Sequence, residues 1–218
     1  MEGARAALGG QGAGLVGPSM LRIAIIGTAG RRDDAARLTS ASFPRMVEAA
    51  KRAAEKLSGG TPWRAVSGGA AWADHVAVVL FLGGVAAGLD LELPAKLSAD
   101  GYVDNGLNDS WRNPGMVSNR YHKAFAQTAG LDPFMDLRRA RSLAACSITE
   151  GGGFLGRNSA IAMADHCVAL TFGCKTLLKP GGTEDTMRKF LARGLGRSVH
   201  IDLHDFSAFS PARVPEAR

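Results

Sequence analysis

The chain alternates between short, continuous apolar runs and longer segments in which apolar positions recur with a helical period. The run LRIAIIG at 21–27 is rich in Ile and ends in glycine, which is typical of a central parallel strand buried on both faces. Further strands are predicted within 63–69, which ends in a glycine turn, and at 89–95, 166–172 and 198–203.

Segments with helical periodicity separate these strands. After Ser42, apolar residues recur every three or four positions, Pro44 falls in the first turn, and Gly59–Gly60 follows the last. Because strands and helices alternate, the predicted fold class is α/β, a Rossmann-like, doubly wound, mostly parallel sheet with helices on both faces. Helices are predicted over 42–60, 72–82, 116–129, 132–145, 156–165 and 183–194.

One domain is expected to span residues 21–206. Residues 1–20 are rich in Gly and Ala and are predicted to be a disordered N-terminal segment, and 207–218 a loose C-terminal tail. The stretch 96–130 breaks the strand–helix rhythm with several Asn, Pro and Gly residues, which indicates an insertion or lid over one end of the sheet. The most apolar stretch, 76–89, is too short to span a bilayer, and two adjacent glycines interrupt it.

Composition narrows the function classes only a little. The 218 residues carry a formal net charge of +6, and 46% of them are hydrophobic, as in an ordinary globular protein. The positive charge permits a polyanionic partner without requiring one, because it is scattered rather than gathered in a basic arm. Cys146, Cys167 and Cys174 form no CxxC pair, so no metal site is expected, and unpaired thiols indicate a reduced, cytoplasmic protein.

Four glycine turns lie at the predicted strand–helix junctions, where doubly wound sheets bind their ligands. In the first, Gly27 ends a strand, Thr28 follows, and Arg31 adds positive charge. Backbone N–H groups in such a turn can face a phosphate. The turn lacks a full GxGxxG pattern, and a surface loop with solvated arginines is the alternative.

The second turn runs from Ser67 through Gly68 and Gly69 into a helix whose positive N-terminal dipole favours an anion. Asp74, near the start of that helix, either complements the dipole or acts as a ribose-hydroxyl acceptor or general base. Trp72 is either a core residue or a platform on which a base stacks.

The third turn follows Glu150 and leads through three glycines to Arg157 and Asn158. Arg157 can bind a phosphate through two hydrogen bonds. Asn158 either contacts the same ligand or caps the helix predicted there. Glu150 is the carboxylate most nearly placed for acid/base chemistry, and a solvated loop residue is the alternative.

The fourth turn consists of Gly181 and Gly182, with Thr183 expected to cap the following helix and to face a phosphate. Glu184 and Asp185 complement the helix dipole, but they would repel a phosphate unless both point away from it. The cations expected to offset them are Lys179 and Arg188.

The order of these turns resembles the SLOG superfamily of Rossmann-like domains. SGGAAWADHVA at 67–77 resembles the SGxAxGxDxxA turn of the DNA-processing protein A (DprA/Smf) family, with Trp72 where that family has Gly. FLGRNSAIAMADHCVAL at 154–170 resembles its F-x-x-R-N run, and IAIIGTAGRRD at 23–33 its IVGSR opening. The opening together with the SGGA and GGT turns is most similar to the YpsA-like branch.

The resemblance implies binding of nucleotides, nucleotide derivatives or single-stranded nucleic acid. The LOG-type phosphoribohydrolases of the superfamily carry PGGxGTxxE, whose Glu serves cleavage of the N-glycosidic bond. In this chain, Asp185 stands at the position of that Thr and Arg188 at the position of that Glu. This departure argues against hydrolysis by the LOG-type residues.

The combined prediction is a cytoplasmic homo-oligomer that binds a nucleotide or nucleotide derivative, with no cofactor and no membrane partner. One alternative is a hydrolase that cleaves an N-glycosidic or phosphate bond, with Glu150 or Asp74 as the acid or base, because a leaving base needs a positioned proton donor. The other is DprA-like binding of a single strand, with Trp72 stacking one base. The residues expected along that strand are Arg31, Arg32, Arg157 and Lys179.

Overall fold

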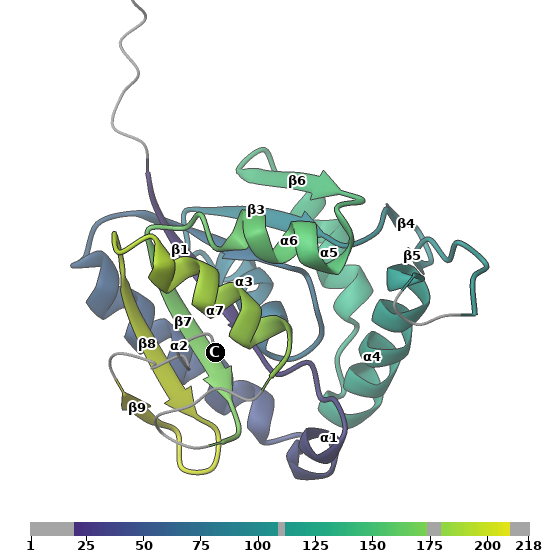
Figure 1. Ribbon diagram of the computed structural model, residues 1–218, viewed down its shortest axis with the longest axis horizontal. Coiled ribbons are helices and arrows are strands. Elements are labelled where there is room, and N and C mark those ends of the chain that lie inside the picture. Colours follow the sequence, from purple (N-terminus) through teal and green to yellow (C-terminus); the bar gives the residue numbers. More distant parts are fainter. Residues whose placement is uncertain (1–19, 109–111, 174–179, 210–218) are drawn as a thin grey trace, which may run out of the picture.

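The computed structural model describes residues 20–108, 112–173 and 180–209, which form an α/β fold around one large sheet (Figure 1). Its strands are β1 (Leu21–Gly27), β2 (Trp63–Ser67), β3 (Gly88–Leu93), β6 (Cys146–Glu150), β7 (His166–Thr171), β8 (Arg197–Asp202) and β9 (Ser207–Phe209), and a separate hairpin consists of β4 (Leu97–Ser98) and β5 (Gly101–Tyr102). The large sheet has the order β6-β3-β2-β1-β7-β8-β9, and all neighbours pair in parallel except β8 and β9. The predicted Rossmann-like, mostly parallel sheet is confirmed.

Helices cover both faces of this sheet, as predicted (Figure 1). They are α1 (Asp33–Arg37), α2 (Ser42–Ser58), α3 (Ala73–Leu82), α4 (Pro114–Ala129), α5 (Pro133–Arg141), α6 (Gly153–Ile161) and α7 (Gly182–Ala192). In β1, Ile23 and Ile25 join a buried cluster with α2 and α3, whereas Ala24 and Ile26 join a second cluster with α6 and α7. Burial of each large aliphatic side chain contributes about 1.5–3 kcal/mol, which explains why both faces are covered. Within the described ranges, no helix is long and apolar enough to cross a membrane.

The predicted insertion at 96–130 contains the β4–β5 hairpin and helix α4. Asn113 caps α4, because its side-chain oxygen accepts a hydrogen bond from the backbone N–H of Met116 at 3.0 Å. The hydroxyl of Tyr102 donates to the carbonyl oxygen of Gly69 at 2.6 Å. This bond ties the inserted segment to the turn after β2, at the carboxyl end of the sheet.

Several boundaries differ from the sequence prediction. Strand β6 was not predicted, because its five residues form no apolar run. In the structure they alternate between partly exposed and exposed positions, as in an edge strand. Helix α5 consequently ends at Arg141 instead of at about residue 145. The short helix α1 was also not predicted. The prediction of a loose tail is wrong for residues 207–209, which pair with β8 as strand β9.

Candidate functional site

The order of the strands reverses between β1 and β7, because β2, β3 and β6 are added on one side of β1 and β7 and β8 on the other. Ligands of open α/β sheets bind beyond the carboxyl ends of the strands at such a switch point. A cavity of about 540 Å³ lies there, which is a usual size for a small-molecule site. All four predicted turns contribute to its wall. The predicted site residues in the wall are Gly27, Thr28, Arg31, Asp74, Arg157, Gly181, Gly182 and Thr183.

The turn after β1 is held by close backbone packing. A Cβ atom at Gly27 would lie 1.9 Å from the carbonyl oxygen of Leu170 on β7, so only glycine fits without movement of the strands. The hydroxyl of Thr28 donates to the carboxylate of Asp34 at 2.6 Å and accepts from the backbone N–H of Gly30 at 3.1 Å. Thr28 therefore orders the loop that leads to Arg31.

The turn after β2 brings three groups close together. A Cβ atom at Gly68 would lie 2.8 Å from both the Arg157 side chain and the Asp74 carboxylate. Gly68 therefore separates a carboxyl group from a guanidinium group. Ser67, Gly68 and Gly69 do not line the cavity. The Ser67 hydroxyl donates to the backbone oxygen of Asp74 at 2.7 Å and accepts from the N–H of Gly69 at 3.2 Å. Ser67 and Gly69 therefore stabilise the turn without being part of the cavity wall.

Asp74 is a buried carboxylate in the wall of the cavity, with 4% of its surface exposed. Burial raises its pKa, although Arg157 and the backbone N–H groups of Ala70, Gly27 and Gly68 act in the opposite direction. Among the residues that the structure describes, no cation lies within salt-bridge distance of Asp74. Asp74 can therefore hold a proton more readily than an ordinary aspartate.

Arg157 is a partly buried cation in the same wall. Burial of its guanidinium lowers its pKa, and the carboxylate of Asp74 opposes this effect. Its protein contacts are long: Nη1 donates to the carbonyl oxygen of Gly68 at 3.4 Å, and Nε and Nη2 lie 3.4 Å from the side-chain oxygen of Asn158. Its charge is therefore available to an anionic ligand in the cavity.

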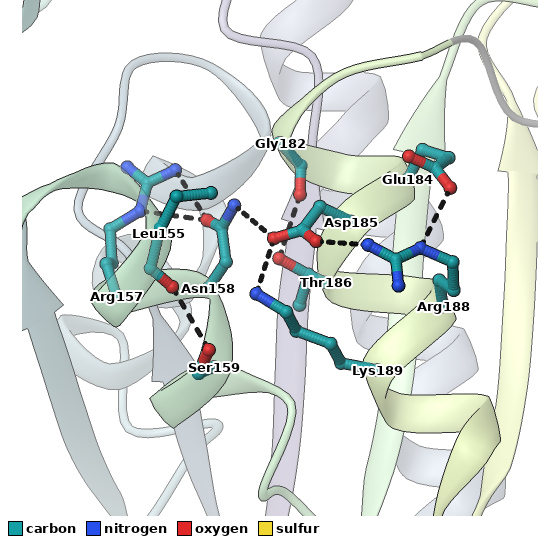
Figure 2. Close-up of polar contacts among 10 residues, drawn as sticks. All are labelled: Leu155, Arg157, Asn158, Ser159, Gly182, Glu184, Asp185, Thr186, Arg188 and Lys189. Atoms are coloured by element: carbon teal, nitrogen blue, oxygen red, sulfur yellow. Dashed lines mark hydrogen bonds and ion pairs between the residues drawn. The ribbon is translucent and has the colours of Figure 1, made fainter. Parts of the chain in front are cut away.

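The acids of helix α7 face away from this cavity. Figure 2 shows Asp185 between Asn158 and the cations Arg188 and Lys189, with hydrogen bonds of 3.1, 2.6 and 2.7 Å. Glu184 pairs with Arg188 at 3.4 Å. Neither acid belongs to the lining of the cavity, so neither carboxylate contacts a ligand bound at the N-terminus of α7. Arg188 offsets both acids, as the sequence predicted, whereas Lys179 lies outside the described residues.

Two of the predicted capping roles are wrong. Thr183 does not cap α7, which begins one residue earlier, and its hydroxyl instead donates to the carbonyl oxygen of Gly27 at 2.8 Å. This bond fixes the start of α7 against the end of β1. Asn158 is not an N-cap either, because α6 already begins at Gly153. Its side chain lies between Arg157 and Asp185 instead (Figure 2).

Two further predicted residues lie outside the cavity wall. Trp72 is only 3% exposed and packs in the core, with ring centroids 4.8 Å from Phe125 and 6.4 Å from Phe43. The core role is thus confirmed, and the stacking platform is wrong for this structure. Glu150 accepts hydrogen bonds from the backbone N–H of Leu97 at 3.0 Å and from Arg141 at 3.2 Å, so it connects the hairpin and α5 to β6.

Thr171 and Phe172, at the end of β7, also line the cavity and were not predicted as site residues. Thr171 is the last residue of β7 and Phe172 comes directly after it, and β7 contains no glycine, so the search for glycine turns missed both. The rule that ligands bind at strand carboxyl ends was a sufficient signal. In the described part of the chain, no group of three or more His, Cys, Asp or Glu side chains is arranged to hold a metal ion. Cys174 lies outside the described residues.

Comparisons with known proteins leave the family open. No family model matches the chain, and no solved structure matches it. An uncharacterized protein of Acanthamoeba polyphaga mimivirus is 38% identical over 128 residues, which cover 57% of this chain. The match spans 64% of the length of the viral protein, so this chain corresponds to less than two thirds of that relative.

Proposed function

We propose that this protein binds a nucleotide or nucleotide derivative in the cavity between the carboxyl ends of β1 and β7. The observation that carries the proposal is the convergence of three anion-binding features on one cavity: the glycine turn after β1, the N-terminus of α7 and the guanidinium of Arg157. Backbone N–H groups at helix N-termini bind phosphates, and a guanidinium binds them through paired hydrogen bonds. Membership of the SLOG superfamily, which the sequence motifs resemble, is part of the same proposal.

The test is calorimetric titration with nucleoside mono-, di- and triphosphates. Arg157→Ala is expected to weaken binding by about 1.5–3 kcal/mol, the contribution of a hydrogen bond to a charged group, while thermal unfolding shows that the variant remains folded. Arg52→Gln is the matched control, because it removes the same charge from an exposed pair with Glu48 on α2. Unchanged affinity in Arg157→Ala, or no nucleotide binding by the unmodified chain, would contradict the proposal.

A second candidate function is hydrolysis of the bound nucleotide, and the surroundings of Asp74 favour it. A carboxyl group whose pKa is raised by burial can keep a proton and donate it to a leaving base. The proposed acid is Asp74 alone, because the carboxylate of Glu150 is engaged by Arg141 and Leu97 outside the cavity. Incubation with a panel of nucleotides should release free base or phosphate, and Asp74→Asn should abolish the release. Full activity in Asp74→Asn, or no turnover of any nucleotide, would remove this candidate.

A further inference from the structure

Five side chains form an alternating row of guanidinium groups and aromatic rings that leads into the cavity. The Cζ atoms of Arg120 and Arg31 lie 5.1 and 5.4 Å from the ring centroid of Tyr121. The Cζ atoms of Arg31 and Arg157 lie 5.8 and 5.7 Å from the ring centroid of Phe154. All four distances are within the range of cation–π attraction. We call this row, Arg120–Tyr121–Arg31–Phe154–Arg157, the arginine–aromatic ladder.

The guanidinium groups of the ladder form no salt bridge within the described residues, although the charge of Asp74 acts on Arg157. Across residues 20–108, 112–173 and 180–209, no Asp or Glu forms a salt bridge with Arg31, Arg120 or Arg157. The cations of α7 differ in this respect, since Arg188 and Lys189 both pair with Asp185. Unpaired guanidinium groups alternating with aromatic rings are suited to a ligand that has both negative charge and planar rings.

The ladder continues the cavity outward. Arg157 and Arg31 belong to the cavity wall, and Arg120 is an exposed residue on α4. Tyr121 and Phe154, between them, are partly exposed. A ligand whose first unit fills the cavity can therefore extend along the ladder without displacing any buried side chain. Helix α4 lies in the segment 96–130, outside the motifs at the strand ends, so it can adapt the site to a particular ligand.

We propose that the cavity and the ladder form one two-part site whose ligand is a dinucleotide. One nucleotide unit occupies the cavity, the linking phosphate lies near Arg31 and Arg157, and the second base stacks on Tyr121 in the place of the exposed Arg120 side chain. This inference rests on the proposed nucleotide-binding function and narrows its ligand class. The linkage is either a pyrophosphate or a phosphodiester, because both place negatively charged phosphate between two bases, although the pyrophosphate carries the greater charge.

The experiment compares the affinities of a mononucleotide, a pyrophosphate-linked dinucleotide and a phosphodiester-linked dinucleotide by calorimetry. In the unmodified chain, at least one dinucleotide is expected to bind about tenfold more tightly than the mononucleotide, the effect of stacking one further base. Tyr121→Leu should reduce that ratio to about one, whereas Tyr121→Phe, which keeps the ring, should preserve it.

The outcomes separate this inference from the function on which it rests. Mononucleotide binding with no gain for either dinucleotide would overturn the ladder site and leave the nucleotide site intact. Binding of dinucleotides alone, dependent on the ring of Tyr121, would support the ladder even if mononucleotides fail to bind. Binding of none of the three ligands would overturn both proposals. Affinity for oligonucleotides that continues to rise from two to twenty nucleotides and falls steeply with salt would also overturn the dinucleotide proposal, in favour of binding to a longer single strand.

Discussion

Asp74 and Glu150 are two carboxylates near the carboxyl ends of the strands of one sheet, and their surroundings differ in nearly every respect. Glu150 ends β6, the edge strand, and accepts hydrogen bonds from Arg141 and from the backbone of Leu97. Asp74 lies in the first turn of α3, within the cavity wall. The charge of Arg157 acts on it, and Gly68 lies between the two side chains. Glu150 connects the β4–β5 hairpin and α5 to β6, whereas Asp74 lies where a ligand in the cavity can contact it.

The difference follows from strand order more than from residue type. The switch point lies between β1 and β7, and β6 is separated from β1 by both β2 and β3. A carboxylate at the sheet edge can be neutralised by a partly exposed arginine at little cost. A buried carboxylate without a paired cation has a raised pKa, which is typical of functional groups. Position relative to the switch point therefore distinguishes a structural acid from a candidate catalytic acid.

The largest effect is expected where the backbone around Asp74 is packed most closely. In Gly27→Ala, the new Cβ atom would lie 1.9 Å from the carbonyl oxygen of Leu170 and 2.7 Å from the Cβ of Ala73. Strand β1 or β7 must then move, so the free energy of unfolding is expected to fall by about 3 kcal/mol. Denaturant unfolding at neutral pH measures this change.

Gly156→Ala is the matched control for that substitution. A Cβ atom at Gly156, within α6, would meet no heavy atom within 4 Å. Because alanine restricts the unfolded chain and favours a helix, this variant is expected to be about 0.5–1 kcal/mol more stable. Equal stability of Gly27→Ala and Gly156→Ala would show that the β1–β7 turn adapts, and the close packing around Asp74 would then not be a constraint.

Glu150→Gln should sharpen the contrast between the two carboxylates. It removes the ion pair with Arg141 and weakens the bond to the backbone N–H of Leu97, so the free energy of unfolding is expected to fall by about 1.5 kcal/mol. Nucleotide affinity should stay unchanged, because Glu150 is not part of the cavity wall. Denaturant unfolding measures the stability and calorimetry the nucleotide affinity. A large loss of affinity with unchanged stability would show that Glu150 takes part in ligand binding.

The sequence predicted the sheet and the position of the site better than it predicted single side chains. Buried parallel strands appear as apolar runs that end in glycine, and Gly27 and Gly68 carried that signal. The partners of Glu150 depend on tertiary packing: Leu97 is 53 residues away in the chain, and no local pattern connects the two. Asn158 was predicted to start a helix because of its capping preference, but the glycines before it allow α6 to begin earlier.

The roles of aromatic side chains also depend on tertiary packing that no local sequence pattern predicts. Trp72 had two open roles in the sequence, since a tryptophan beside a glycine turn suits both a core and a stacking platform. Packing against Phe125 from the inserted segment decides for the core. Tyr121 and Phe154 contact Arg31 from two different helices, so no periodic pattern in the sequence predicts these contacts.

The smallest expected effect is a difference in how two aspartates respond to pH. The pKa of Asp74 is raised above the usual aspartate value of 3.8 by burial, so the native state binds this proton at a higher pH than the unfolded state does. The contribution of Asp74 to stability therefore increases as the pH falls through its folded pKa, above 3.8. The pKa of Asp185 is lowered: burial raises it, but the bonds from Lys189 and Asn158 and the charges of Lys189 and Arg188 outweigh burial. Its contribution is present above 3.8 and is lost only as the pH falls through its lower folded pKa.

The measurement is the free energy of unfolding of the unmodified chain minus that of Asp74→Asn, followed from about pH 8 down to about pH 4. This difference should rise in favour of the unmodified chain as the pH falls, because asparagine cannot take up the proton. Asp185→Asn is the control: its difference should stay flat over that range and should shrink only at lower pH. A flat profile for Asp74→Asn would mean that its carboxyl titrates alike in the folded and unfolded states. Asp74 would then be an ordinary ionised aspartate, and the contrast with Glu150 would reduce to position alone.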